Sequence, residues 1–192
     1  IQRAAVIGAG TMGRGIVMCL ANAGVAVQWV DNNPQMLEQA LVTVADTYAH
    51  SVRQERIDQA EADARIARVT AAANYAAIRD VDLVIEAVYE NLELKQSIFR
   101  ELDGLLKPEA ILASNTSALD IDAIAAVTRR PQQVLGLHFF SPAHIMKLLE
   151  IVRGAKTAPA VLDAAQELGR RIGKVCVVAG NCEPLVPGHA FS

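Results

Sequence analysis

The sequence predicts an α/β fold in which helices cover both faces of a mostly parallel sheet. Short apolar runs alternate along the chain with amphipathic, helix-like segments, which is the pattern of parallel strands joined by crossover helices. A glycine-rich turn at residues 8–13 follows the first of these runs. Two helical segments, 34–53 and 58–67, then succeed one another with no strand between them, so we expect a helical hairpin that projects from the sheet.

The glycine-rich turn makes the predicted fold Rossmann-like. An apolar strand at 4–7 leads into Gly-Ala-Gly-Thr-Met-Gly, a helix follows, and a second apolar run ends on Asp31. This is the G-x-G-x-x-G pattern with the strand, helix and acidic residue that a dinucleotide site requires. Gly8 allows the tight turn, Gly10 lets a pyrophosphate approach the backbone, and Gly13 lets the helix pack close to the strand.

Asp31 indicates which nicotinamide cofactor the site takes. Its carboxylate can accept both hydroxyl protons of an adenosine ribose, and it would repel a 2′-phosphate. The next residues, 32–34, offer no arginine to neutralise such a phosphate. The sequence therefore favours NAD(H) over NADP(H).

The remaining elements follow from apolar periodicity and capping residues. Asp58 begins the second hairpin helix, Thr157 is expected to cap the last helix, and Gly173 to end it. The apolar run 147–152 follows its predecessor closely enough to return antiparallel, which gives the sheet an antiparallel edge. The expected order after the hairpin is strand 83–88, helix 91–105, strand 110–113, helix 120–127, strands 134–140 and 147–152, a helix to 173 and strand 175–178.

Polar residues gather where the predicted strands end. Asp31, Glu86, Glu90, the run Ser114–Ser117 and His138 each close or follow an apolar strand. Because ligands of open α/β sheets bind at the carboxyl ends of the strands, we expect these residues to share one site.

His138 and Glu150 are the candidates for acid–base chemistry. Glu150 lies inside the apolar run 148–152, where an ionised carboxylate is costly unless it is paired. If the last two apolar runs of the sheet pair antiparallel, Glu150 comes within reach of His138. It would then fix the imidazole tautomer and stabilise the cation, as a general base requires. A purely structural buried pair is the alternative, and the place of His138 at the ligand-binding edge favours catalysis.

Four segments resemble the NAD-binding domain of the L-3-hydroxyacyl-CoA dehydrogenases. They are GAGTMGRGI at 8–16, VIEAVYENLELK at 84–95, SNTS at 114–117 and GLHFFSPAHIMKLLEIVRG at 136–154. The resemblance is nearest to the dehydrogenase part of bifunctional β-oxidation proteins, which also carry an enoyl-CoA hydratase domain. It covers residues 3 to about 182 and implies an NAD-binding domain at 1–182. The implied reaction converts (S)-3-hydroxyacyl-CoA to 3-ketoacyl-CoA, with NAD+ as the hydride acceptor.

The resemblance also implies roles for single residues. His138 takes the proton of the substrate 3-hydroxyl, Glu150 orients His138, and Ser117 hydrogen-bonds the hydroxyl beside the nicotinamide. Lys95 reaches a ribose or carboxamide oxygen; without the resemblance it would be a solvated helix residue, and Glu90 a surface acid. The full implied set of cofactor contacts is Gly8, Gly10, Thr11, Met12, Gly13, Asp31, Val88, Glu90, Lys95 and Ser117.

The resemblance also implies that the helical hairpin contacts the CoA moiety of the substrate, as it does in this family. Here it presents four arginines, and Arg53 is the one that we expect at the CoA phosphates. A solvated charged face is the alternative. The four are Arg53, Arg56, Arg65 and Arg68.

The composition limits the kinds of partner and the cellular compartment that we expect for this protein. A net charge of −3 gives no electrostatic reason to expect nucleic acid or an anionic membrane, and no apolar stretch reaches the length of a membrane span. No metal site is expected. The three cysteines are unpatterned and no signal peptide is recognised, which favours the cytoplasm.

The end of the sequence departs from the family pattern. Gly188 stands where the family has the Asn of an Asn-Arg pair, and Ser141 stands where the family often has an Asn that contacts the cofactor. We expect an altered tail at 183–192 and no C-terminal helical domain, which in the family closes over the substrate and forms the dimer. A homodimer is expected only with that domain, and the chain is expected to bind NAD(H) but turn over acyl-CoA poorly. Two alternatives stay open, a free 3-hydroxyacid dehydrogenase with a catalytic lysine and a non-catalytic NAD-binding structural or sensing protein.

Overall fold

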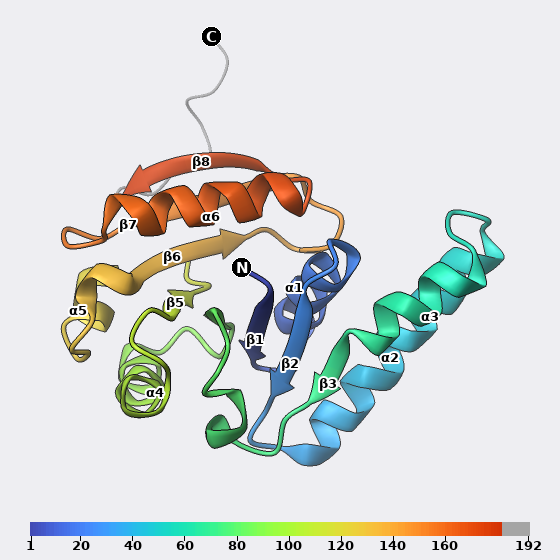
Figure 1. Ribbon diagram of the computed structural model, residues 1–192, viewed down its shortest axis with the longest axis horizontal. Helices are drawn as coiled ribbons and strands as arrows, with labels where there is room; N and C mark the ends of the chain where they lie inside the picture. Colours follow the sequence, from blue (N-terminus) through green and yellow to red (C-terminus); the bar gives the residue numbers. More distant parts are fainter. Residues whose placement is uncertain (182–192) are drawn as a thin grey trace, which may run out of the picture.

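The computed structural model describes residues 1–181, so the predicted altered tail lies outside the described residues. Eight strands form one sheet in the order β3-β2-β1-β4-β5-β6-β7-β8 (Figure 1). Neighbours are parallel from β3 to β6, β7 is antiparallel to β6, and β8 is parallel to β7. The predicted Rossmann-like sheet with an antiparallel edge is confirmed, and that edge comprises two strands. The strands are β1 (Arg3–Ile7), β2 (Ala26–Val30), β3 (Val69–Ala71), β4 (Leu83–Glu86), β5 (Ile111–Ser114), β6 (Val134–Phe139), β7 (Leu148–Arg153) and β8 (Val175–Gly180).

Helices cover both faces of the sheet, as the alternation of strands and helices predicts. Successive strand residues point to opposite faces, so Val6 and Ile85 face one core while Ala5 and Val84 face the other. Helices α1, α2 and α6 close the first core, and α4 and α5 close the second. The helices are α1 (Thr11–Asn22), α2 (Pro34–Arg53), α3 (Gln59–Ala67), α4 (Leu92–Leu105), α5 (Ile121–Ala125) and α6 (Pro159–Arg171), with 3₁₀ turns η1 (Tyr75–Ile78) and η2 (Pro131–Gln133).

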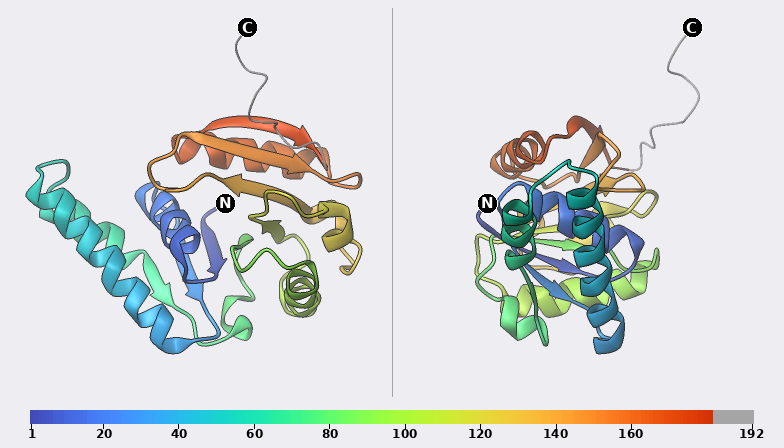
Figure 2. Two further views of the ribbon diagram at one scale, coloured as in Figure 1. Left: turned by 180° about the vertical axis from the view of Figure 1, so that it is seen from behind. Right: turned by 90° about the vertical axis from the view of Figure 1, so that its right-hand side faces the viewer.

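The predicted hairpin of α2 and α3 projects from one side of the sheet (Figures 1 and 2). Side-chain hydrogen bonds from Tyr48, Arg65 and Arg68 tie it to α1. The Tyr48 hydroxyl, on a side chain that is only 1% exposed, donates to Oδ1 of Asn22 at 2.7 Å. The Arg68 guanidinium donates to the carbonyl of Ala21 at 2.8 Å. These contacts hold the hairpin beside the helix that carries the glycine-rich turn.

Three details differ from the sequence-based expectation. Strand β3 was not predicted, because three partly exposed residues at a sheet edge are too few to show a period. Thr157 does not cap α6. Its hydroxyl donates to the carbonyl of Val134, and Ala158 takes the cap position. Strand β4 ends at Glu86 rather than at 88, because the Val88 N–H donates to the Glu86 carboxylate and not to a neighbouring strand.

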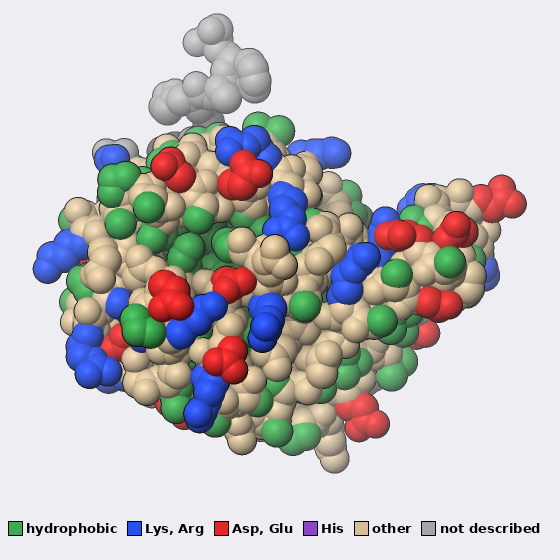
Figure 3. All heavy atoms as spheres, in the orientation of Figure 1, with side chains coloured by type: hydrophobic (Ala, Val, Ile, Leu, Met, Phe, Trp, Pro, Cys, Tyr) green, Lys and Arg blue, Asp and Glu red, His purple; other side chains and the backbone are tan. Residues whose placement is uncertain are grey.

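The surface offers no broad region of one charge on the face drawn in Figure 3, where acidic and basic side chains are interspersed. Among residues 1–181, no helix combines the length and the apolar character needed to cross a bilayer.

Candidate functional site

The three glycines of the turn have different surroundings. Gly8 leaves β1 with φ +110°, and a Cβ atom there would lie 2.6 Å from the carbonyl oxygen of Ala87. A Cβ atom on Gly13 would lie 2.0 Å from the carbonyl oxygen of Gly8. Among residues 1–181, no heavy atom lies within 4 Å of the Cβ position of Gly10. The fold itself therefore requires glycine at 8 and 13, while the space beside Gly10 is open to a ligand.

A cleft of about 350 Å³ opens beside this turn. It lies where the strand order reverses between β1 and β4, the place at which doubly wound sheets bind nucleotides. Gly10 caps α1, whose first turn contains no acidic residue, so the positive end of the helix dipole faces an incoming anion. The lining includes Gly8 to Met12, Asp31, Met36, Tyr75, Ala87, Val88, Tyr89, Leu94 and Ile98.

The carboxylate of Asp31 borders the cleft and is held by the backbone. One oxygen accepts the N–H of Ala9 at 2.8 Å, and the other accepts the N–H of Asn33 at 2.8 Å. A carboxylate oxygen accepts more than one hydrogen bond, so both remain able to accept a ribose hydroxyl. The predicted acceptor at the end of the second strand thus lies beside the glycine turn.

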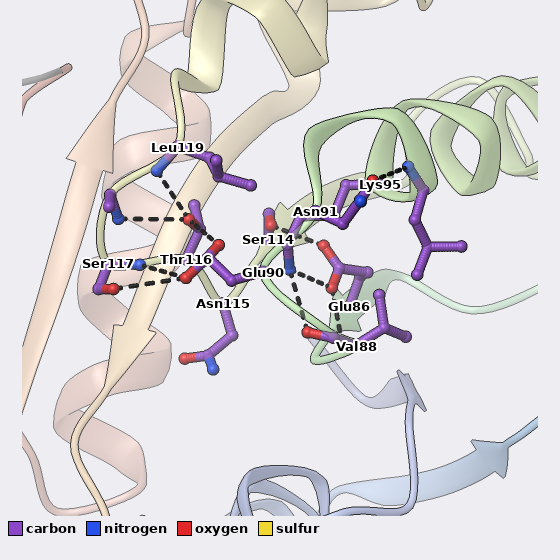
Figure 4. Close-up of polar contacts among 12 residues, drawn as sticks. Glu86, Val88, Glu90, Asn91, Lys95, Ser114, Asn115, Thr116, Ser117 and Leu119 are labelled. Atoms are coloured by element: carbon purple, nitrogen blue, oxygen red, sulfur yellow. Dashed lines mark hydrogen bonds and ion pairs between the residues drawn. The ribbon is translucent and has the colours of Figure 1, made fainter.

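Glu86 and Lys95 form an ion pair in which both side chains are 0% exposed (Figure 4). Lys95 Nζ donates to Glu86 Oε2 at 2.6 Å and lies 3.4 Å from the carbonyl oxygen of Val88. The direct contact of Lys95 with the cofactor stays a prediction, and the sequence-based interpretation of Lys95 as a solvated helix residue is wrong. Its ammonium is enclosed behind Val88, and Val88 is the residue that lines the cleft.

Glu90 lies across from the loop that follows β5 (Figure 4). Its Oε1 accepts the Thr116 hydroxyl at 2.5 Å, and its Oε2 lies 3.3 Å from the Ser117 amide nitrogen and 3.4 Å from the Ser117 hydroxyl. The structure thus brings together Glu90 and Ser117, two residues that the sequence placed at one edge. Sequence reasoning did not single out Thr116, whose hydroxyl also accepts the N–H of Leu119.

His138 and Glu150 face one another across the antiparallel strands β6 and β7. The distance from Nδ1 of His138 to Oε2 of Glu150 is 3.8 Å, which is an ion-pair distance and longer than a hydrogen bond. The Glu150 side chain is 10% exposed and that of His138 is 19% exposed, with its ring against that of Phe140. The predicted antiparallel pairing is confirmed, and it places the imidazole at the carboxyl end of β6 with a carboxylate behind it.

A second, smaller cavity of about 180 Å³ was not anticipated from the sequence. It lies between α1, α2 and the loop that follows β6, and Arg14 and His144 are among its lining residues. Burial, with the positive charge of Lys174 nearby, lowers the pKa of His144. Arg53 does not line this cavity and ends α2 at the far end of the hairpin.

Residues 3–182 match the family model described as the 3-hydroxyacyl-CoA dehydrogenase, NAD binding domain. The chain belongs to this family. As an NAD-binding domain of this family, it binds NAD.

Relatives and solved structures agree with this assignment. The domain is 48% identical, over 97% of its length, to a peroxisomal bifunctional enzyme of Danio rerio, and 36% identical, over 95%, to the α subunit of a fatty acid oxidation complex of Psychrobacter. It superposes on 3-hydroxybutyryl-CoA dehydrogenase of Escherichia coli with a TM-score of 0.93 and 36% identity, over 94% of this chain and 38% of that one. The (S)-3-hydroxybutyryl-CoA dehydrogenase of Ralstonia eutropha gives a TM-score of 0.92 and 34% identity, over 94% of this chain and 64% of that one. The chain spans about a quarter of the length of the curated relatives it matches.

Proposed function

We propose that this NAD-binding domain serves the oxidation of (S)-3-hydroxyacyl-CoA to 3-ketoacyl-CoA in fatty-acid β-oxidation. The observation that carries the proposal is the register of β6 and β7, which sets Glu150 directly behind His138 at the ligand-binding edge of the sheet. The names of the relatives support it, since they are enzymes of β-oxidation or 3-hydroxyacyl-CoA dehydrogenases.

His138 acts as the general base in this proposal. Its Nδ1 faces Glu150, so Nε2 is the nitrogen available to take the proton of the substrate 3-hydroxyl. NAD+ supplies the acceptor for the hydride that leaves C3. The Glu150 carboxylate stabilises the imidazolium that forms and holds the ring in place. Ser117 exchanges its contact with Glu90 for the substrate hydroxyl.

The acyl-CoA would approach from the hairpin side of the domain. The second cavity connects the loop after His138 with α1 and α2, and Arg14 provides a cation on its wall. Arg53 lies six residues beyond Thr47, a residue of the same cavity, or roughly 9 Å further along α2. We therefore assign Arg53 to the CoA phosphates farther from the acyl thioester, and Arg14 to those nearer it.

The cellular compartment and the oligomeric state of the protein stay predictions. Several relatives are named as peroxisomal enzymes, so the cytoplasmic location expected from the sequence is not established. A homodimer is expected only when a helical domain follows this one.

The alternative of a free 3-hydroxyacid dehydrogenase requires an available catalytic lysine, and Lys95 is enclosed in an ion pair with Glu86.

The test is oxidation of NADH by acetoacetyl-CoA. We would compare this chain with a chimaera in which the C-terminal part of the Escherichia coli 3-hydroxybutyryl-CoA dehydrogenase follows residue 181. The chimaera is expected to oxidise NADH with acetoacetyl-CoA. The substitution His138→Gln is expected to lower the kcat of the chimaera by about 10²–10⁴-fold without changing its affinity for NADH. His50→Gln, the same change at an exposed position of the hairpin, is the control and is expected to leave kcat unchanged. A chimaera that binds NADH but never consumes acetoacetyl-CoA would contradict the acyl-CoA assignment.

A further inference from the structure

Residues 140–147 form the loop that joins β6 to β7, and this loop starts two residues after His138. It passes beside α1, the helix that begins at the glycine turn (Figure 1). Pro142 and His144 of the loop line the smaller cavity together with Arg14. The conformation of the 140–147 loop therefore affects the candidate base, the cavity and the packing of the helix that leaves the glycine turn.

Ala143 packs tightly against α1. A Cβ atom on Gly15 would lie 2.8 Å from the Cβ atom of Ala143 and 3.1 Å from its backbone nitrogen, so glycine at 15 leaves the room that the loop needs. One turn further along the helix, the thiol of Cys19 donates to the carbonyl of Ala143 at 3.1 Å. The helix thus gives the loop both a notch and a hydrogen-bond donor.

Lys174 holds the same loop from another element. It lies in the turn between α6 and β8, and its ammonium donates to the carbonyls of Ala143 and Met146. Within residues 1–181, no carboxylate forms an ion pair with this half-buried side chain. An ammonium that leaves water needs acceptors in its place, and here both acceptors belong to one loop.

Apolar packing contributes little to holding the 140–147 loop. Ala143 alone among its residues is buried, while Ile145 and Met146 are 63% and 42% exposed. Inside the loop, the N–H groups of Ile145 and Met146 both donate to the carbonyl of Pro142. A segment with so few buried contacts opens easily unless polar contacts hold it, and Lys174 provides two of them.

We propose that Lys174 is a positioning residue, which holds the 140–147 loop on α1 and so fixes His138 relative to the glycine turn. Phe140, the first residue of the loop, transmits the effect, because its ring centroid lies 4.3 Å from that of His138. The hold on the loop is independent of the reaction, while its effect on catalysis rests on the proposed function.

The first experiment measures how fast N-ethylmaleimide modifies Cys19 in the 192-residue chain, read from the mass of the peptide that contains it. Cys19 is 5% exposed and its thiol is bonded to the loop. Lys174→Met removes the donors but keeps an aliphatic stem. It is expected to speed the modification about tenfold, because the loop opens more often.

The lost charge acts in the opposite direction. Burial raises the pKa of the Cys19 thiol, and the Lys174 ammonium opposes that rise. Because the thiolate is the reactive form, removal of the charge alone would slow the modification. Faster modification in Lys174→Met therefore reports opening of the loop.

Gly15→Ala tests the loop from the side of α1, since its methyl group would push Ala143 away. This variant is also expected to speed the modification of Cys19. Gly15→Ala with Ala143→Gly removes the colliding methyl group and is expected to return the rate toward that of the wild type. Lys107→Met is the matched control, because Lys107 is also a partly exposed lysine but pairs with Asp82. Its rate is expected to equal that of the wild type.

The second experiment places Lys174→Met in the chimaera. A displaced base is expected to lower kcat for acetoacetyl-CoA about tenfold, with the Kd for NADH unchanged, whereas a purely structural role would lower only the Tm.

Four results would overturn the proposal. They are an unchanged rate of Cys19 modification in Lys174→Met, an equal rise in Lys107→Met, no slowing when Ala143→Gly is added to Gly15→Ala, and a wild-type kcat in the Lys174→Met chimaera. A parent chimaera that consumes no acetoacetyl-CoA would instead refute the proposed function. The Cys19 experiment needs no substrate, so the two failures are distinguishable.

Discussion

Alanine at Gly10 and at Gly13 is expected to separate cofactor affinity from stability. Both positions belong to the same turn, and both changes add one methyl group. At Gly13 the new Cβ atom would lie 2.0 Å from the carbonyl oxygen of Gly8, which is 1.0 Å inside the 3.0 Å limit of real contacts. At Gly10 it would meet no atom of the described part of the chain within 4 Å. The first methyl group collides with the fold, and the second enters only the cleft.

The magnitudes follow from these contacts. The Cβ atom is fixed by the backbone of residue 13 and meets the backbone carbonyl oxygen of Gly8, so neither atom can turn away. The start of α1 must therefore move away from the end of β1, at a cost of about 3 kcal/mol or roughly 6–12 °C in Tm for a domain of this size. Gly10 has φ −77°, which alanine adopts without strain. Gly10→Ala is therefore expected to be neutral or to stabilise the fold by about 0.4–1 kcal/mol through the unfolded state. The same methyl group would hold the pyrophosphate off the backbone and is expected to raise the Kd for NADH about 100-fold, or about 2.7 kcal/mol.

The assay uses thermal melts followed by circular dichroism and titration with NADH followed by its fluorescence. Gly13→Ala is expected to melt early, and Gly10→Ala to melt like the wild type and bind NADH weakly. A Gly10→Ala protein with wild-type affinity would refute the placement of the pyrophosphate over Gly10. A Gly13→Ala protein with an unchanged Tm would refute the close packing of α1 on β1.

Three further predictions concern other parts of the domain. Burial raises the pKa of Tyr48 to about 12, so its stabilising effect is complete below pH 10 and is lost as the pH rises through 12. Between pH 10 and 12, the free energy of unfolding in urea is expected to fall about 2 kcal/mol more for the wild type than for Tyr48→Phe, and equal falls would contradict this. The Arg130 guanidinium donates to the Asp103 carboxylate and to three backbone carbonyls at and just after the end of α4, so Arg130→Ala is expected to lower the free energy of unfolding by about 3–5 kcal/mol. A loss below 1 kcal/mol would show that water replaces these contacts. In the chimaera, Arg53→Gln is expected to raise KM for acetoacetyl-CoA about fivefold at low salt with kcat unchanged, and an unchanged KM would leave Arg53 on a solvated face.

Much of the fold follows from local patterns. The glycine turn, the acid at the end of the second strand and the apolar runs lie within short stretches, and each reflects a backbone conformation or a period that neighbouring residues impose. Gly8 and Gly173 do take positive φ values where the sequence predicts a turn and a helix end. Asp58 likewise accepts the N–H of Glu61, as its predicted capping position requires.

The pairing of His138 with Glu150 follows partly from a local sequence pattern and partly from the tertiary structure. The sequence indicates that a carboxylate in an apolar strand needs a partner, because an unpaired buried charge is costly. It does not say which residue lies opposite. The antiparallel register of β6 and β7 decides that His138 does, at a distance of 3.8 Å.

The contacts of the other polar residues of the site are known only from the tertiary structure. Lys95 looks solvated on its helix, yet it is buried because the end of β4 lies beneath α4 and offers it Glu86. Glu86 meets Ser114 across 28 positions of sequence, and Glu90 meets Ser117 across 27. Such contacts depend on which strands are neighbours and where each one stops. Local sequence patterns predict a dinucleotide-binding sheet and the residues at its edge, because short-range conformation and burial encode both. The partners of those residues are set by long-range packing, which local patterns do not specify.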